Sequence, residues 1–209
     1  MSLVLFYAPG ACSGVTINAL EELGLPCEYR KISIASGEQK SEQYLKVNPF
    51  GKVPALLVDG KLLTENPAIL IYLNSLSSTT KILPEMKGAF QQSIVYSDLM
   101  WISSTLHPSI RHVCIPSYYT LSTEVDEVVE RGKIALKINF DLVAQRLKNS
   151  DWWYGDEWSI ADTYLHWCYT RAERGGYSLD AFPEFRAHQQ RVESRASYQR
   201  RKLIENSTL

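Results

Sequence analysis

The start of the fold is encoded in residues 3–24, which read LVLFYAPGACSGVTINALEELG. The first five residues form a short, continuous apolar run, which is typical of a strand buried on both faces. A Pro9-Gly10 turn ends that strand. From Ser13, a residue type that caps helices, apolar residues recur at helical spacing until Gly24 stops the helix. The chain therefore opens with a buried strand, a turn and a helix.

The next segments continue this alternation. Residues 28–34 form an extended run, and a polar helix is expected over residues 38–47. Residues 53–63 predict a hairpin, because an Asp-Gly pair at its centre supplies the positive φ angles of a tight turn. Pro67 suits the first turn of the helix that follows, where a missing N–H costs nothing. The expected order is β-α-β-α-β-β-α, an α/β domain.

The pattern changes after Leu76, where a stretch rich in serine and threonine follows. Beyond it, apolar residues repeat at helical spacing, and a capping-box motif, Ser159-x-x-Asp162, marks one helix start. The second part of the chain is therefore expected to be all-helical. The expected divisions are an α/β domain over residues 1–77, a linker over 78–87 and an all-helical domain over 88–209.

The composition excludes several classes of protein. The 209 residues carry 22 Lys+Arg and 23 Asp+Glu, a formal net charge of −1, so no basic surface for a nucleic acid is expected. Hydrophobic residues make up 45% of the chain, which is too many for a disordered protein. No apolar run reaches the roughly 18 residues of a membrane span, and the first residues lack the features of a signal peptide. We expect a cytoplasmic protein with no nucleic-acid or membrane partner.

The cysteine pattern predicts free thiols. No C-x-x-C pair occurs, and the histidines lack the i,i+4 spacing of a helical zinc motif, so neither a disulfide framework nor a metal site is expected. The four cysteines are Cys12, Cys27, Cys114 and Cys168.

Three segments could carry chemistry, and each also has a purely structural explanation. Cys12 stands at a helix start that would lower its thiol pKa, although a buried cysteine can equally be a small hydrophobe. Val53-Pro54, if cis, would turn the Val53 backbone toward an extended peptide, but an edge-strand proline is the alternative. Glu65-Asn66 could bind both charges of an α-amino acid head group or simply cap a helix.

Together these segments resemble the cytosolic glutathione S-transferase family. Ser159-Ile160-Ala161-Asp162 in the second part agrees as well, so the resemblance spans nearly the whole chain. It implies a thioredoxin-like N-terminal domain with a cis proline, an all-helical C-terminal domain and a homodimer. The motifs that carry it are Tyr7-x-Pro9-Gly10-Ala11-Cys12-Ser13, Asn48-Pro49-x-Gly51-Lys52-Val53-Pro54-Ala55-Leu56 and Thr64-Glu65-Asn66-x-Ala68-Ile69-x-x-Tyr72-Leu73.

The first motif looks most like the bacterial beta class, in which a cysteine lies at the glutathione sulfur. The resemblance implies that Cys12 is this thiol and that Ser13 is its hydroxyl neighbour. It also implies that His107, from the first helix of the second domain, lies beside the sulfur. Lys52 and Val53 would hold the cysteinyl-glycine part of glutathione, while Glu65 and Asn66 would hold the γ-glutamyl head. The full set of implied glutathione-binding residues is Tyr7, Lys52, Val53, Pro54, Glu65 and Asn66.

Two positions depart from the family pattern. Asn66 stands where many members have serine, and its amide can still accept from a backbone group or donate to a carboxylate. Pro108 follows His107 where the beta class usually has lysine, which removes a cation and is expected to bend the helix.

The implied function is a transferase that activates the glutathione thiol for attack on a small, hydrophobic electrophile in detoxification, with glutathione as co-substrate and no metal. Two alternatives stay open. Cys12 could itself attack a glutathione mixed disulfide, which would make the protein a glutathione-dependent reductase. The fold could also serve as a non-catalytic assembly module. Aromatic side chains that could line the electrophile pocket are Trp101, Tyr118, Tyr119 and Trp167.

Overall fold

The structure, a computed structural model, describes residues 1–207. These residues form two compact units. The first, the α/β unit, contains residues 1–83 and the segment that begins at Ser194, and the second, the helical unit, contains Pro84–Glu193.

The α/β unit is built on a four-stranded sheet with the order β2-β1-β3-β4. The central strand β1 runs parallel to β2 and antiparallel to β3. The β3–β4 hairpin turns at Asp59 and Gly60, which both have positive φ angles of 47° and 80°, and this confirms the predicted hairpin. The strands are β1 (Leu3–Tyr7), β2 (Glu28–Lys31), β3 (Ala55–Val58) and β4 (Lys61–Thr64).

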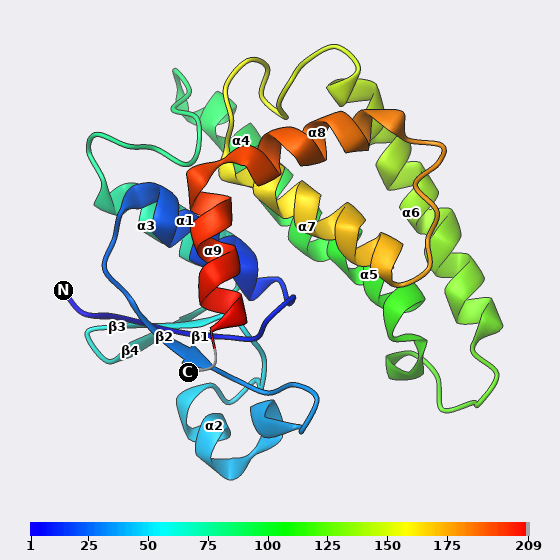
Figure 1. Ribbon diagram of the computed structural model, residues 1–209, viewed down its shortest axis with the longest axis horizontal. Coiled ribbons are helices and arrows are strands. Elements are labelled where there is room, and N and C mark those ends of the chain that lie inside the picture. Colours follow the sequence, from blue (N-terminus) through cyan, green and yellow to red (C-terminus); the bar gives the residue numbers. More distant parts are fainter. Residues whose placement is uncertain (208–209) are drawn as a thin grey trace. The chain divides into compact units, whose positions relative to one another are not determined.

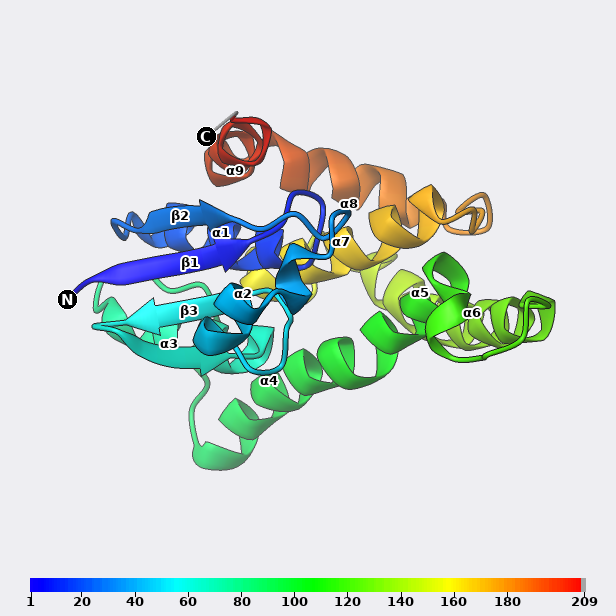
Figure 2. The same cartoon turned by 90° about the horizontal axis from the view of Figure 1, so that it is seen from below.

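Helices cover both faces of this sheet. Figure 1 shows α1 (Ser13–Leu23) and α3 (Asn66–Leu76) on one face and α2 (Glu42–Val47) on the other, and Figure 2 shows α2 in front of the strands from below. Phe6 packs with Tyr44 of α2, so the alternate residues Leu5 and Tyr7 face the other side of the sheet. The expected β-α-β-α-β-β-α order and thioredoxin-like fold are therefore confirmed.

A further helix, α9 (Ala196–Asn206), belongs to the α/β unit, where it packs on α1. Asn18 donates to the Ser197 hydroxyl at 3.2 Å, and Arg200 Nε lies 2.8 Å from Glu21 Oε2. The segment that begins at Ser194 thus packs with the α/β unit, whereas the sequence pattern predicts it in the second domain, 88–209. The polar anchors explain the difference, because their partners on α1 stand about 180 residues earlier in the chain.

The helical unit contains only helices and loops among its described residues. A continuous helical stretch is made of α4 (Ala89–Trp101), a π-helical segment (Ile102–Leu106) and α5 (His107–Cys114). The His107 N–H bonds to the carbonyl of Ile102, five residues back. Pro108 has no N–H to donate, and the helix widens to a π turn just before it instead of breaking.

The remaining helices of this unit are long and well anchored. Almost every side chain of α7 is buried, as predicted for a central helix, and its Ser159–Asp162 capping box is formed. No helix among residues 1–207 is both long and apolar enough to cross a membrane. The helices are α6 (Asp126–Leu147), α7 (Ile160–Arg174) and α8 (Pro183–Ser194).

Candidate active site

The turn between β1 and α1 is closed by one buried hydroxyl. Ser13 Oγ accepts from the Ala8 N–H at 3.1 Å and donates to the Ala8 carbonyl at 3.2 Å. Gly10 in the same turn has a φ angle of 71°, which glycine adopts without strain. The Ser13 hydroxyl hydrogen is thus used inside the protein, and it would have to leave Ala8 to reach a bound sulfur.

Cys12 occupies the N-cap position of α1 and is only 8% exposed. Its thiol donates to the Val53 carbonyl at 3.7 Å. The Val53–Pro54 peptide bond is cis, the isomer that the resemblance implied. The positive potential of a helix N-terminus favours a nearby anion, so this is a suitable place for a thiolate.

The backbone leading to Val53 is fixed by two side chains. The Lys52 carbonyl accepts from Tyr44 Oη and from Asn48 Nδ2, both at 2.7 Å. Gly51 has a φ angle of 58°, and a Cβ atom there would lie 2.7 Å from the Gln39 carbonyl, so only glycine fits. The Lys52 side chain itself is exposed.

Asn66 and Glu65 behave differently from one another. The buried Asn66 accepts from Thr16 Oγ1 at 2.8 Å and donates to the Cys12 carbonyl at 3.1 Å, so both ends of its amide join α3 to α1. Glu65 is exposed and has a φ angle of 67°, a conformation that non-glycine residues rarely adopt. Such strain concentrates at binding sites, where it aims particular groups outward.

Tyr7 is buried, and its phenol forms a hydrogen bond with α9. Tyr7 Oη donates to the Ile204 carbonyl at 3.1 Å. Burial raises the pKa of Tyr7, a hydrogen bond with Ser207 lowers it, and the Glu205 carboxylate raises it. Tyr7 therefore acts here as a neutral donor to α9.

Glu205 is a residue of this site that the sequence did not predict. Its Oε1 atom accepts from the Gly10 N–H at 3.2 Å, inside the turn before α1. Arg201 and Glu205 stand at the i,i+4 spacing typical of a helical ion pair, but nothing in the sequence connects that pair to a turn 195 residues earlier.

His107 lies in the helical unit, where α7 holds its ring. His107 Nδ1 is 3.1 Å from Tyr164 Oη, and the ring contacts Trp167 edge to face with centroids 4.5 Å apart. Trp167 is buried against this histidine, Tyr119 stacks on His112, and Tyr118 is exposed.

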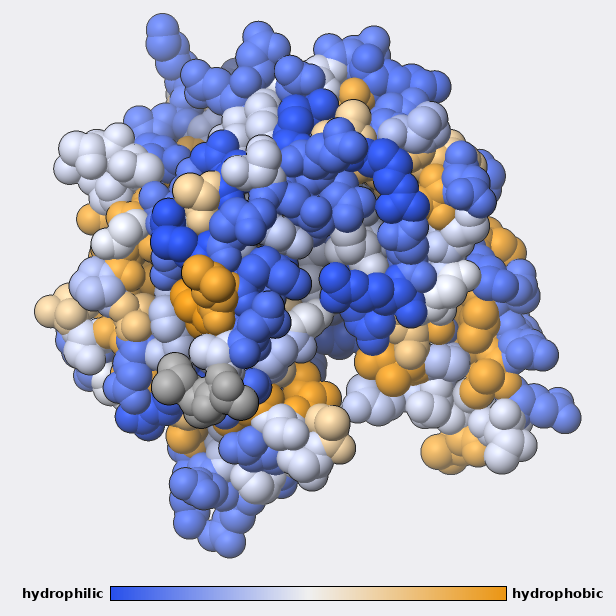
Figure 3. Space-filling view, in the orientation of Figure 1, coloured by the Kyte–Doolittle hydropathy of each residue, from blue (hydrophilic) through white to orange (hydrophobic). Residues whose placement is uncertain are grey.

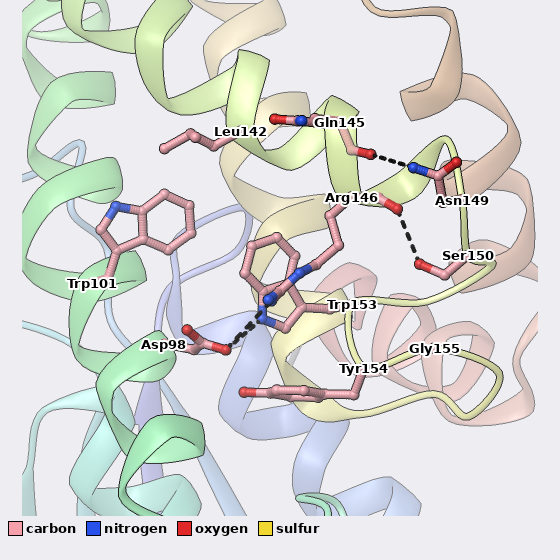
Figure 4. Close-up of a pocket in the computed structure, with 10 residues that line it drawn as sticks. All are labelled: Asp98, Trp101, Leu142, Gln145, Arg146, Asn149, Ser150, Trp153, Tyr154 and Gly155. Atoms are coloured by element: carbon pink, nitrogen blue, oxygen red, sulfur yellow. Dashed lines mark hydrogen bonds and ion pairs between the residues drawn. The ribbon is translucent and has the colours of Figure 1, made fainter. Parts of the chain in front are cut away.

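A cavity of about 760 Å³ is also present in the helical unit. Figure 4 shows Trp101 of α4 beside Trp153, with Arg146 of α6 across the Trp153 ring. The Trp153 indole donates to Asp98 at 2.8 Å, so the polar groups of the cavity are largely satisfied by each other. Of the four aromatic side chains expected to line an electrophile pocket, this cavity contains Trp101. Its lining residues are Asp98, Trp101, Leu142, Gln145, Arg146, Asn149, Ser150, Trp153, Tyr154 and Gly155.

The part of the chain that the structure describes has no cluster of three His, Cys, Asp or Glu side chains able to hold a metal ion. The groups that the structure brings together at the turn before α1 are instead a thiol, a strand backbone and a strained carboxylate-bearing residue next to a buried amide.

Two family models match this chain. The one described as the glutathione S-transferase N-terminal domain covers residues 1–75, and the one described as the C-terminal domain covers residues 101–196. Glutathione S-transferase GstA of Escherichia coli O157:H7 is 29% identical over 93% of this chain and 94% of its own length.

Solved structures agree over a similar extent. A glutathione transferase homologue from Sulfitobacter with bound glutathione has a TM-score of 0.87 and 26% identity, covering 97% of this chain and 98% of its own. A bacterial beta class glutathione S-transferase from Sphingomonas chungbukensis has a TM-score of 0.84 and 30% identity over the same shares.

Proposed function

The chain belongs to the glutathione S-transferase family, and we propose that it joins the thiol of glutathione to a small, hydrophobic electrophile. The observation that carries the site is the convergence of Cys12, Val53 and Asn66 at the start of α1, through contacts of 3.7 Å and 3.1 Å. Glutathione is the co-substrate, and it binds along this turn.

The backbone of Val53 is suited to hold the cysteinyl part of the tripeptide. An extended peptide can pair with a strand backbone through main-chain hydrogen bonds. Tyr44 and Asn48 fix the preceding carbonyl from behind, so the Val53 backbone is held ready for such pairing. The exposed Lys52 ammonium is suited to the glycyl carboxylate, and the exposed Glu65 carboxylate to the γ-glutamyl amino group.

Activation of the thiol is the chemical step that the site must assist. The glutathione thiol is mostly protonated at pH 7, and each unit of pKa depression corresponds to about 1.4 kcal/mol of differential stabilisation. The start of α1 supplies positive potential. The Cys12 S–H makes only a long contact of 3.7 Å with the Val53 carbonyl, and it serves as a donor to the sulfur when it turns away from that carbonyl. Because Ser13 already donates to Ala8, we assign it to holding the turn. The predicted role of His107 at the thiol stays a prediction.

The reductase alternative is favoured by one specific observation, the position of the Cys12 thiol at the N-cap of α1. In that reaction the Cys12 thiolate attacks the glutathione sulfur of a mixed disulfide, and the other thiol leaves. A second glutathione thiolate then attacks the new Cys12–glutathione disulfide, which releases oxidised glutathione and regenerates the Cys12 thiolate.

Replacing Cys12 by serine separates the two reactions. We expect Cys12→Ser to retain much of the conjugation of glutathione to an activated aryl chloride and to lose reduction of a glutathione mixed disulfide. Cys168→Ser, which changes a buried cysteine of the helical unit, is the matched control and should alter neither rate. Loss of conjugation in Cys12→Ser, with folding and glutathione binding intact, would contradict the transferase mechanism and favour Cys12 as the nucleophile.

A further inference from the structure

Helix α9 buries a pair of opposite charges beside the turn before α1. Arg201 and Glu205 are each 6% exposed, and Arg201 Nε lies 3.4 Å from Glu205 Oε2. Burying an ion pair costs free energy that its mutual attraction barely returns, so it is weak evidence for added stability. The contacts of the pair indicate a different role.

The last turn of α9 touches three parts of the candidate site. Glu205 Oε1 accepts from the Gly10 N–H at 3.2 Å, and the Ile204 carbonyl accepts from Tyr7 at 3.1 Å. A Cβ atom at Gly14 would lie 2.9 Å from Glu205 Oε1, so a glycine in the first turn of α1 permits this approach. Two consecutive residues of α9 thus hold the end of β1 and the turn by hydrogen bonds, and they lie close against the start of α1.

From this geometry we propose that Glu205, oriented by Arg201, is a positioning residue for thiol activation. Its carboxylate fixes the Gly10 N–H, and this sets the direction in which Cys12 and the first N–H groups of α1 face a bound sulfur. The inference rests on the proposed function for the identity of that sulfur. Glu205 need not touch glutathione, because it acts through the turn.

The test compares Glu205→Gln with Glu205→Ala. Both variants remove the negative charge opposite Arg201. The difference in kcat between them therefore measures the effect of losing the acceptor for the Gly10 N–H. An amide oxygen can still accept that hydrogen, whereas a methyl group cannot. We expect Glu205→Gln to keep a kcat close to wild type and Glu205→Ala to have a kcat about tenfold lower, the size of one net hydrogen bond.

Two further readouts separate positioning from a general loss of stability. The ultraviolet absorbance of the bound glutathione thiolate should titrate at higher pH in Glu205→Ala than in Glu205→Gln, while the KM for glutathione changes little. Gly14→Ala is a second variant, because its methyl group displaces Oε1, and it should resemble Glu205→Ala. Arg200→Ala removes a more exposed α9–α1 ion pair with Glu21 and should leave kcat and the thiolate titration unchanged.

Equal kcat values and equal thiolate titrations for Glu205→Gln and Glu205→Ala would overturn the proposal. The rate at which iodoacetamide alkylates Cys12 tests it without glutathione, since a displaced turn should change that rate in Glu205→Ala but not in Glu205→Gln. If the wild type failed to bind glutathione, the proposed function would fail, and the alkylation rates would still decide the positioning role.

Discussion

Asn66 joins two helices through a single side-chain amide. It accepts from Thr16 and donates to the Cys12 carbonyl, and all of these groups are buried. Replacing it by alanine removes both hydrogen bonds and leaves the buried Thr16 hydroxyl without this acceptor, although the Cys12 carbonyl still accepts from the Val15 N–H at 3.1 Å. We therefore expect Asn66→Ala to lower the free energy of unfolding by about 2 kcal/mol. Urea denaturation measures this. Asn149→Ala, at an exposed asparagine, is the control, and equal losses for both variants would show that the amide does not tie the helices.

The thiol of Cys27 has a higher pKa than an ordinary cysteine. Burial raises its pKa to about 12, although a backbone hydrogen bond from Leu5 opposes the shift, and the carboxylates of Glu28 and Glu21 add to it. We therefore expect iodoacetamide to alkylate Cys27 much more slowly at pH 8.5 in the folded chain than in the urea-unfolded chain. Mass spectrometry of the Cys27 peptide measures both rates, and similar rates would contradict the assigned burial.

The same shift has a consequence for stability. The folded chain retains a proton that the unfolded chain releases near pH 8.5. The stabilisation is therefore fully present below that pH and is lost as the pH rises toward 12.

The residues left Val53–Pro54 open between a cis bond and an edge-strand proline, and the family resemblance implied the cis isomer that the structure has. The same resemblance placed Ser13 and Asn66 at glutathione, which stays a prediction, and in the structure their polar atoms bond Ala8, Thr16 and Cys12. A hydroxyl or amide at a helix start is equally able to bind a ligand or another turn, and only the fold shows which partner is near.

At the scale of elements, α7 depends on one buried carboxylate. Asp162 Oδ2 accepts from the Ser159 N–H at 2.8 Å. Asp162 Oδ1 accepts from the Trp153 N–H at 2.6 Å and lies 3.1 Å from His188 Nε2. Removing one member of a buried charged network costs about 3–5 kcal/mol.

We accordingly expect Asp162→Ala to unfold at much lower urea concentration, with an early change in tryptophan fluorescence from the helical unit. Asp180→Ala, which alters an exposed carboxylate, should stay within about 0.5 kcal/mol of wild type. A denaturation midpoint for Asp162→Ala close to wild type would show that the cap is dispensable.

Strong periodicity made most elements predictable. The apolar run at β1, the Asp-Gly hairpin and the buried face of α7 all appear in the structure. The π-helical turn before His107 and the attachment of α9 to α1 were not predicted. Hydrophobic periodicity encodes neither feature. The π turn accompanies the missing N–H of Pro108, and the attachment of α9 depends on polar partners that are far apart in the sequence.

At the scale of the whole molecule, an apolar surface on α6 bears on the expected homodimer. Ile134, Ile138 and Leu142 are each more than half exposed and follow one another at intervals of four residues, so they share one helix face. Figure 3 shows apolar surface over this part of the helical unit. Exposed apolar faces of this kind commonly serve association.

If the homodimer uses this face, Ile138→Glu should shift the chain from dimer to monomer. Sedimentation velocity measures the shift. Lys137→Glu, at an adjacent position that pairs with Asp141, changes charge beside the face and should have a much smaller effect. A dimer unchanged by Ile138→Glu would place the interface elsewhere.

The central claim is that glutathione binds at the turn before α1, and calorimetric titration of glutathione into wild type and Glu65→Ala tests it most directly. Glu28→Ala is the control, because Glu28 is an exposed carboxylate opposite Val4, toward the other end of β1 from the turn. We predict saturable binding to wild type and Glu28→Ala, and affinity at least about tenfold weaker in Glu65→Ala, since the amino group of the γ-glutamyl head loses its charged partner. No binding to wild type at millimolar glutathione, or equal affinity in all three proteins, would contradict the account.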